Sequence, residues 1–393
     1  MNQQQQGASP RDKTVALVLG SGGARGYAHI GVIEELEARG YRVVAISGCS
    51  MGALVGGVYA AGQLAAYRDW VCQLDYFDVL RLVDVTWSPM GAMRANKVMS
   101  KLESLIDDTR IEDLDIAVTT VATDLTRQRE VWFQSGSLLE AIRASIAVPG
   151  VITPVHCGDQ VLVDGGLLNP LPIIPTVSAR ADFVMAVNVT AHSPRPVSLE
   201  ELLPPDEAAE EKAREEARDA GGVDFASWID GVRGAARRLF DGLSNGNANG
   251  NGGALPPAAN KKGQVDEALE RDRREWGRLD MVLASFDITQ AALAKYKVAG
   301  YPPDVLIEVP KTVCGAYEFH RAEALISLGR HLAVDALDRF EGLTHPGWGD
   351  QAIVVEPTGE ETDEEPDVGP VEEADQGTGE EAGEESGEEK APS

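Results

Sequence analysis

Short runs of apolar residues alternate with stretches of helical periodicity along the first half of the chain. The runs have the length of buried strands and lie at Val15–Leu19, Val43–Ser47, Ile116–Ala122, Val161–Val163 and Phe183–Val189. Apolar residues at helical spacing predict helices over Tyr27–Ala38 and Met51–Ala61. Strands that alternate with helices favour a mainly parallel sheet flanked by helices. We therefore predict an α/β domain over residues 14–191, with ligands at the carboxyl ends of its strands.

The pattern changes after this domain. Residues 192–263 are charged or amphipathic and include the glycine- and asparagine-rich run 245–253, so we expect an insertion with a flexible linker. Within it, Phe225–Leu243 places apolar residues at helical spacing, with arginines between them. Such a helix fits a lipid surface, or it covers the core or another subunit. A C-terminal α/β accessory region is expected over 264–345, with helices around a strand at Val305–Val309.

The chain is acidic, with 63 acidic and 35 basic residues among 393 and a formal net charge of -28. Residues 356–393 hold 16 of the acidic residues and one lysine, and we expect this tail to be disordered. Nucleic-acid binding is disfavoured, because it needs a basic surface that neutralises phosphates. A lipid surface is not disfavoured, since residues 1–200 carry a net charge of only -5.

Nothing in the sequence indicates export or a membrane span. Residues 1–13 lack the apolar segment of a signal peptide and are expected to be flexible, and no run of 18 apolar residues occurs. The cysteines are scattered without a C-x-x-C pair, which favours reduced thiols: Cys49, Cys72, Cys157 and Cys314. These features predict a cytoplasmic protein, soluble or peripheral at the inner membrane face, and they leave its oligomeric state open.

The segment Gly48-Cys49-Ser50-Met51-Gly52 follows a predicted strand and opens a predicted helix. This is the setting of a G-x-S-x-G nucleophile elbow, in which a sharp turn between small residues presents the serine hydroxyl near a helix N-terminus. An ordinary glycine-rich turn is the alternative. We predict that Ser50 is a nucleophile.

A second glycine-rich turn, Gly20-Ser21-Gly22-Gly23-Ala24-Arg25-Gly26, also joins a predicted strand to a predicted helix. Glycines allow backbone N–H groups to approach an anion closely. That anion is either a nucleotide phosphate or the oxyanion of acyl transfer, and a turn that serves packing alone is a third interpretation. Arg25 stands where G-x-G-x-x-G needs glycine, and no Lys-Ser/Thr pair completes a P-loop, so a nucleotide is disfavoured.

The triplet Asp164-Gly165-Gly166 offers a carboxylate at the end of a short predicted strand, although Asp-Gly is also a common turn dipeptide. No histidine lies in a sequence context typical of a catalytic triad; the six are His29, His156, His192, His320, His331 and His345. A Ser-Asp dyad is simpler, but an aspartate with a pKa of about 3.9 is a poor base at neutral pH unless burial raises that pKa. No spacing is typical of metal ligands, and we expect no metal or other cofactor.

In their order within one α/β unit, GSGGARG, GCSMG and DGG resemble the patatin-like phospholipases, most closely the bacterial members related to neuropathy target esterase. The supporting segments are GYAHIGVIEEL, GALVGGVYAAG and AIRASIAVPGVITPV, and the likeness covers about residues 15–190 closely and 264–340 more weakly. The resemblance implies a Ser-Asp dyad, with Ser50 as nucleophile and Asp164 as general base. It also implies an oxyanion hole at the Gly22 and Gly23 amides, with Arg25 nearby.

The remaining motif positions are expected around the same site: Gly20, Ser21, Gly26, Gly48, Gly52, Gly165 and Gly166. Ser21 departs from the family, whose loop often has three consecutive glycines. A side chain is tolerated there if the Ser21 amide faces the oxyanion. The insertion at 192–263 has no counterpart in compact members, so the resemblance implies nothing about it.

The sequence therefore predicts a serine acyl hydrolase that cleaves fatty acyl esters of (lyso)phospholipids or related lipids. An acyltransferase would use the same dyad with another acceptor. A non-catalytic nucleotide-binding or regulatory protein would explain the glycine loop, but not Ser50 and Asp164 together. Head group, chain length and physiological role stay open.

Overall fold

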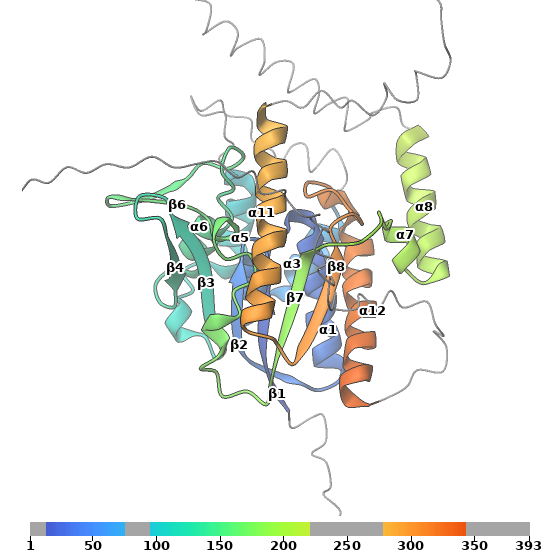
Figure 1. Ribbon diagram of the computed structural model, residues 1–393, viewed down its shortest axis with the longest axis horizontal. Helices are drawn as coiled ribbons and strands as arrows, with labels where there is room; N and C mark the ends of the chain where they lie inside the picture. Colours follow the sequence, from blue (N-terminus) through green and yellow to red (C-terminus); the bar gives the residue numbers. More distant parts are fainter. Residues whose placement is uncertain (1–12, 75–94, 221–277, 343–393) are drawn as a thin grey trace, which may run out of the picture. The chain divides into compact units, whose positions relative to one another are not determined.

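The computed structural model describes residues 13–74, 95–220 and 278–342. Its centre is an eight-stranded sheet in the order β5-β6-β3-β2-β1-β7-β8, with β4 paired to β3 off this path (Figure 1). The strands are β1 (Thr14–Leu19), β2 (Arg42–Cys49), β3 (Ala117–Asp124), β4 (Arg129–Phe133), β5 (Val155–Cys157), β6 (Gln160–Asp164), β7 (Phe183–Ala191) and β8 (Val305–Pro310).

The sheet is mainly parallel. Strands β3, β2, β1, β7 and β8 run in one direction, whereas β4 and β6 pair antiparallel with β3, and β5 pairs antiparallel with β6. The predicted fold class is confirmed, and the six predicted strands correspond to β1, β2, β3, β6, β7 and β8. The sequence does not predict β4 or β5, because β4 mixes charged and apolar residues on a largely accessible strand and β5 has only three residues.

Helices cover the sheet. They are α1 (Ala28–Ala38), α2 (Met51–Ala60), α3 (Leu64–Cys72), α5 (Asn96–Ile106), α6 (Leu138–Ser145), α7 (Leu199–Leu202), α8 (Pro205–Ala220), α11 (Arg278–Gly300) and α12 (Ala322–Glu341). The described residues also form five short 3₁₀ turns: η2 (Gly23–Tyr27), η3 (Ile111–Asp113), η4 (Gly165–Leu167), η5 (Ile174–Thr176) and η6 (Phe319–Arg321). The two predicted helices are confirmed as α1 and α2.

The central strands are buried on both faces. In β1, Leu17 and Leu19 belong to the main hydrophobic core together with α1, whereas Val18 lies in a second cluster with Ala294 of α11. Because successive side chains of a strand point to opposite faces, α1 and α11 cover opposite faces of the sheet. Figure 1 shows α11 running beside β7, which it contacts. Burial on both faces explains why these strands are continuous apolar runs in the sequence.

The C-terminal segment completes the same sheet. Strand β8 pairs with β7, and α12 packs closely against α1. A Cβ atom at Gly31 would lie 1.9 Å from the carbonyl oxygen of Ile326, and one at Gly329 would lie 2.0 Å from that of Ala28. The two helices therefore touch backbone to backbone, which only glycine permits at these positions.

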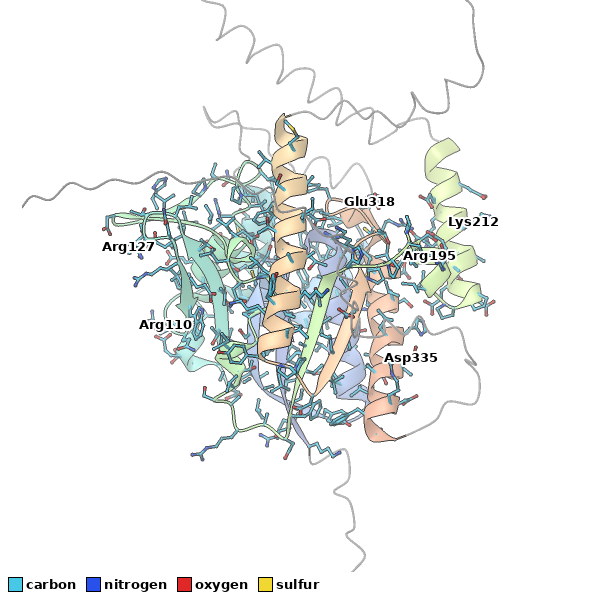
Figure 2. The ribbon with its side chains drawn as sticks, in the orientation of Figure 1. Arg110, Arg127, Arg195, Lys212, Glu318 and Asp335 are labelled. Carbon is cyan, nitrogen blue, oxygen red and sulfur yellow. The ribbon has the colours of Figure 1, made fainter. Side chains whose placement is uncertain are left out.

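Helices α7 and α8 belong to the predicted insertion and contact the rest of the described chain. Arg321 forms ion pairs with Glu200 of α7 and Glu211 of α8, so charged contacts hold both helices. Figure 2 shows further charged side chains at the periphery, among them Arg127 and Lys212. No helix in the described ranges has the length and apolarity that a membrane span needs.

Several predictions fall outside the described residues. They concern the amphipathic segment Phe225–Leu243, the linker 245–253, the acidic tail 356–393 and all but the last residue of 1–13.

Candidate active site

Ser50 lies in a sharp turn between β2 and α2. Its backbone has φ 54° and ψ -120°, a conformation that a residue with a side chain rarely adopts. A Cβ atom at Gly52 would lie 2.1 Å from the carbonyl oxygen of Leu19, and one at Gly48 would lie 2.6 Å from the Ala53 nitrogen. The small flanking residues are therefore required by packing, and the turn has the geometry of a nucleophile elbow.

Ser145, at the end of α6, holds this turn. The Ser50 N–H donates to Ser145 Oγ at 2.8 Å, and the Ser145 hydroxyl donates to the Val121 carbonyl at 2.6 Å. Ser145 is fully buried, so both bonds are shielded from water. Ser145 is not among the predicted site residues, although it lies within the segment AIRASIAVPGVITPV on which the resemblance partly rests.

Asp164 ends β6, and the sheet brings it beside the elbow. Asp164 pairs with Ala122 of β3, and the preceding residue, Val121, pairs with Cys49 of β2. Asp164 Oδ1 accepts hydrogen bonds from the Gly166 N–H at 2.7 Å and from the Cys49 thiol at 3.8 Å. Oδ2 is buried and forms no hydrogen bond with the described residues. Oδ1 is thus held in place, whereas Oδ2 has no partner among the described residues.

Burial raises the pKa of Asp164 to about 6. The Ser50 hydroxyl, the Gly166 amide and the Cys49 thiol oppose this rise in the pKa, which places Ser50 in the immediate surroundings of the carboxylate. An aspartate of this pKa is ionised at neutral pH and is still basic enough to accept a proton. The difficulty that the sequence raised for an aspartate base is therefore resolved by burial.

The backbone N–H groups of the glycine loop fall into two sets, those that donate inside the protein and those that do not. Three of them donate inside the protein: Gly20 to the Val187 carbonyl at 3.0 Å, Ser21 to Pro170 at 2.8 Å and Ala24 to Ala316 at 2.8 Å. The Gly22 and Gly23 amides donate to no acceptor in the described residues. The Ser21 amide does not face an oxyanion as expected, because it donates to Pro170, and the Ser21 side chain is accommodated by a hydrogen bond to Gln290.

Gly23 is the position in this loop where glycine is needed most. Its φ is +61°, and a Cβ atom there would lie 2.3 Å from the carbonyl oxygen of Ala316. Backbone conformation and space both exclude a side chain. The 22–23 pair therefore presents two adjacent amides at the end of β1, next to the elbow that follows β2.

Arg25 is fully engaged in supporting the loop. Its Nε donates to the Gly22 carbonyl at 3.1 Å, Nη1 to the Lys311 carbonyl at 3.0 Å, and Nη2 to Asp287 Oδ1 at 3.0 Å. The side chain is only 3% exposed. The guanidinium therefore fixes the Gly22 carbonyl. Because this carbonyl and the Gly23 N–H belong to one peptide group, the Gly23 amide is oriented as well.

His29, which follows the loop, contacts its backbone. Its Nε2 lies 2.9 Å from the Gly20 carbonyl, and burial lowers the pKa of the imidazole to about 4. The ring is neutral at physiological pH, and Nε2 carries the proton because a carbonyl can only accept. This histidine therefore fixes the start of the glycine loop.

The C-terminal segment also reaches the site, and no motif in the sequence predicts this. Asp287 and Gln290 of α11 contact Arg25 and Ser21 of the glycine loop. Tyr317 lies near Asp164 and Asp287, and burial together with these carboxylates raises the pKa of its phenol to about 12. Residues far apart in the sequence thus surround the two motifs.

Comparison with known proteins identifies the family of this chain. Residues 17–177 match the patatin-like phospholipase family. A protein of Mycobacterium bovis, named an uncharacterized NTE family protein, is 41% identical over 358 residues, which cover 85% of this chain and 93% of that protein. The chain belongs to the patatin-like phospholipase family. The resemblance seen in the sequence is confirmed, and membership of this family supports a lipid hydrolase.

Other relatives share a smaller part of the patatin-like chain. Mouse patatin-like phospholipase domain-containing protein 6 is 34% identical over 185 residues, which cover 45% of this chain and 13% of that protein. A second NTE family protein of Mycobacterium tuberculosis is 36% identical over 165 residues, 41% of this chain and 27% of the other. The structure of VipD from Legionella pneumophila overlaps at a TM-score of 0.38 and 14% identity, with 84% of this chain and 67% of that chain covered, and adds nothing to the assignment.

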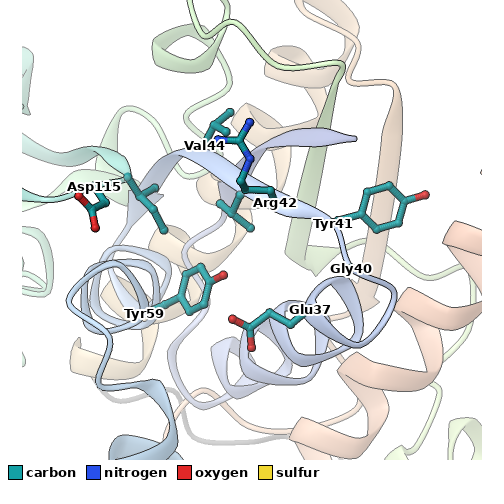
Figure 3. Close-up of a pocket in the computed structure, with 9 residues that line it drawn as sticks. Glu37, Gly40, Tyr41, Arg42, Val44, Tyr59 and Asp115 are labelled. Atoms are coloured by element: carbon teal, nitrogen blue, oxygen red, sulfur yellow. The ribbon is translucent and has the colours of Figure 1, made fainter. Parts of the chain in front are cut away.

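A pocket of about 680 Å³ opens at the opposite end of the sheet (Figure 3). Its lining includes Glu37, Arg42, Tyr59 and Asp115, around the amino ends of β2 and β3. Ser50 follows the carboxyl end of β2, and a strand of that length separates the two places by roughly 25 Å. No lining side chain leaves a buried polar atom without a partner. The pocket of this patatin-like chain is therefore separate from the candidate active site.

Proposed function

We propose that this patatin-like chain hydrolyses fatty acyl esters of (lyso)phospholipids or related lipids through Ser50 and Asp164. Ser50 Oγ attacks the ester carbonyl carbon while Asp164 Oδ2 takes the hydroxyl proton. The Gly22 and Gly23 amides donate to the oxyanion of the tetrahedral intermediate. Its collapse breaks the ester C–O bond, and the leaving alcohol takes the proton back from Asp164.

The second half of the reaction repeats the first with water. Asp164 removes a proton from a water molecule, which attacks the acyl-serine ester and forms a second tetrahedral intermediate. The serine oxygen leaves, recovers the proton from Asp164, and the fatty acid is released. An acyltransferase would differ only in the acceptor of this step.

The proposal depends above all on Asp164, which is buried beside the Ser50 elbow and has one carboxylate oxygen without a hydrogen bond to the described residues. Asp164 Oδ1 is fixed by the Gly166 N–H, while Oδ2 is free of hydrogen bonds with the described residues. A carboxylate in a purely structural role would be expected to use both oxygens, since an unpartnered buried acceptor costs about 1–3 kcal/mol.

The state of the loop amides argues against a nucleotide site. A phosphate cradle uses several consecutive N–H groups. Here the Gly20, Ser21 and Ala24 amides donate within the protein, and among residues 20–24 the Gly22 and Gly23 amides alone have no acceptor in the described part of the chain. Two adjacent donors fit a single oxyanion better than a phosphate chain.

A fluorophosphonate probe, which reacts with activated serines, tests the assignment. We expect one adduct per wild-type chain and none on Ser50→Ala, with exposed Ser104→Ala labelled like the wild type. A folded wild type that is not labelled, or an equally labelled Ser50→Ala variant, contradicts the proposal. A lipid panel then ranks substrates, and added alcohol or thiol acceptors separate hydrolysis from acyl transfer.

We propose in addition that the chain is cytoplasmic and makes peripheral contact with the inner membrane face. The amphipathic, arginine-bearing sequence Phe225–Leu243 supports this contact by its composition. Liposome flotation of the full chain and of a chain that lacks residues 223–244 tests it. Equal flotation of the two proteins would contradict membrane contact through this segment.

A further inference from the structure

Helix α11 buries a polar residue against the candidate active site. Gln290 is only 3% exposed, although the outward side of the same helix carries exposed apolar residues such as Ile288 and Tyr296. A buried carboxamide is costly unless hydrogen bonds satisfy it. The contacts of Gln290 therefore need an explanation.

Those contacts are with two catalytic loops. The Ser21 hydroxyl donates to Gln290 Oε1 at 3.3 Å. If Gly166 had a Cβ atom, that atom would lie 2.2 Å from Gln290 Nε2, 2.8 Å from Ser21 Oγ and 3.0 Å from Asp164 Oδ1. The carboxamide, the hydroxyl and the carboxylate thus surround one point, where Gln290 bonds to the glycine loop and lies against the loop that carries Asp164.

A second residue of α11 supports the same loop from one turn earlier. Asp287 accepts from Arg25 Nη2 at 3.0 Å, and Arg25 Nε donates to the Gly22 carbonyl at 3.1 Å. Residues three apart lie on one face of a helix, so Asp287 and Gln290 approach the loop together. Helix α11 therefore fixes the loop at two points, Ser21 and Arg25.

We propose that Gln290 is a positioning residue that sets the distance between the oxyanion amides and Asp164, because it bonds to Ser21 and packs against the Gly166 turn. This inference rests on the proposed function. It also gives Ser21 a role, because the hydroxyl that replaces a glycine of the family's loop is the group that Gln290 accepts from. Gln290 Oε1 holds the loop while Nε2, which bonds to no described residue, faces the turn beside Asp164.

A charge at position 290 tests the proximity to Asp164. In Gln290→Glu, a second carboxylate beside Asp164 raises its pKa, since like charges disfavour ionisation. We expect the pH of half-maximal fluorophosphonate labelling to rise from near 6 by about one unit. The matched control is Thr289→Glu, which adds the same charge at an exposed neighbour on the same helix and leaves the midpoint unchanged.

Removal of the side chains tests the bridge. We expect Gln290→Ala and Ser21→Ala each to slow labelling about tenfold, and the double variant to be no slower than either single variant, because all three lose one contact. Gln290→Met, which keeps the volume, should be as slow as Gln290→Ala. Melting temperatures show whether each variant is folded at the assay temperature.

The outcomes separate the two proposals. A labelled wild type with an unshifted midpoint in Gln290→Glu, or additive effects of Ser21→Ala and Gln290→Ala, overturns the role of Gln290 and leaves the hydrolase intact. If Gln290→Glu does not fold, the double-variant comparison decides alone. A folded but unlabelled wild type overturns both proposals.

Discussion

The turn after β1 and the turn after β2 are built alike, but they use their backbone differently. Each follows a buried parallel strand, is rich in glycine and opens a helical turn. In the second turn, the Ser50 N–H is bonded to Ser145 and the side chain is what the turn presents. In the first, the side chain of Arg25 is bonded inside the protein, and the Gly22 and Gly23 N–H groups are presented instead.

The same local topology, a strand followed by a glycine-rich turn and a helix, thus has two chemical functions. A nucleophile needs a fixed backbone with an accessible hydroxyl, whereas an oxyanion hole needs a fixed side-chain scaffold with accessible amides. The groups that stay without an internal partner therefore indicate function more directly than the presence of glycine.

The largest effect is expected at the carboxylate that lies beside the serine turn. Asp164→Asn should lower the rate of hydrolysis about 10²–10⁴-fold, because the amide cannot accept the serine proton. Its size is nearly unchanged, and its carbonyl oxygen can still accept from the Gly166 N–H. Wild-type activity in this variant would show that Asp164 is not the base.

The same substitution should stabilise the fold. The pKa of Asp164 is about 6 in the folded chain and about 3.9 when unfolded, so the folded state binds more protons between these values. Wild-type stability therefore falls as pH rises through this window, by up to about 3 kcal/mol above it. Chemical denaturation should find Asp164→Asn more stable at pH 8, with the gap closing toward pH 4. An equal gap at both pH values would contradict the buried charge.

The next effect concerns the glycine turn. Gly23→Ala should lower the rate about 10²–10³-fold, because the strain and the clash with Ala316 move an oxyanion donor. Gly62→Ala is the matched control, with a φ of +71° and no heavy atom within 4 Å of its Cβ position. It should cost about 1 kcal/mol of stability and leave activity unchanged. Equal activities of the two variants would remove Gly23 from the oxyanion hole.

The smallest effect is expected for Ser145, whose hydroxyl accepts from the Ser50 N–H. Ser145→Ala leaves the Ser50 N–H and the Val121 carbonyl without partners, which should cost about 1–3 kcal/mol of stability. Relaxation of the turn should slow hydrolysis about tenfold, equivalent to about 1.4 kcal/mol. Urea denaturation and initial rates measure the two effects, with Ser104→Ala as an exposed control. An unchanged rate would mean that the Ser50 turn keeps its geometry without Ser145.

The sequence predicts the fold class and both glycine turns because strand, turn and helix are local features. It also places Ser50 and Asp164 at strand ends, but not side by side, because Asp164 reaches the elbow through the antiparallel pairing of β6 with β3. It does not predict Ser145, Asp287 or Gln290, which act on partners 95, 262 and 269 residues away. Their positions depend on helix packing, and of the three only Ser145 lies in a segment on which the resemblance rests.

The pH dependence of Ser50 labelling, with peptide mapping of the adduct, tests the central claim most directly. We expect the adduct on Ser50, with a rate that rises tenfold per pH unit below about 6 and is constant above it, since burial raises the pKa of Asp164 to about 6. Asp164→Asn should show no such rise and almost no adduct. Labelling at another residue, or equal labelling of Asp164→Asn at every pH, would contradict the Ser50–Asp164 dyad.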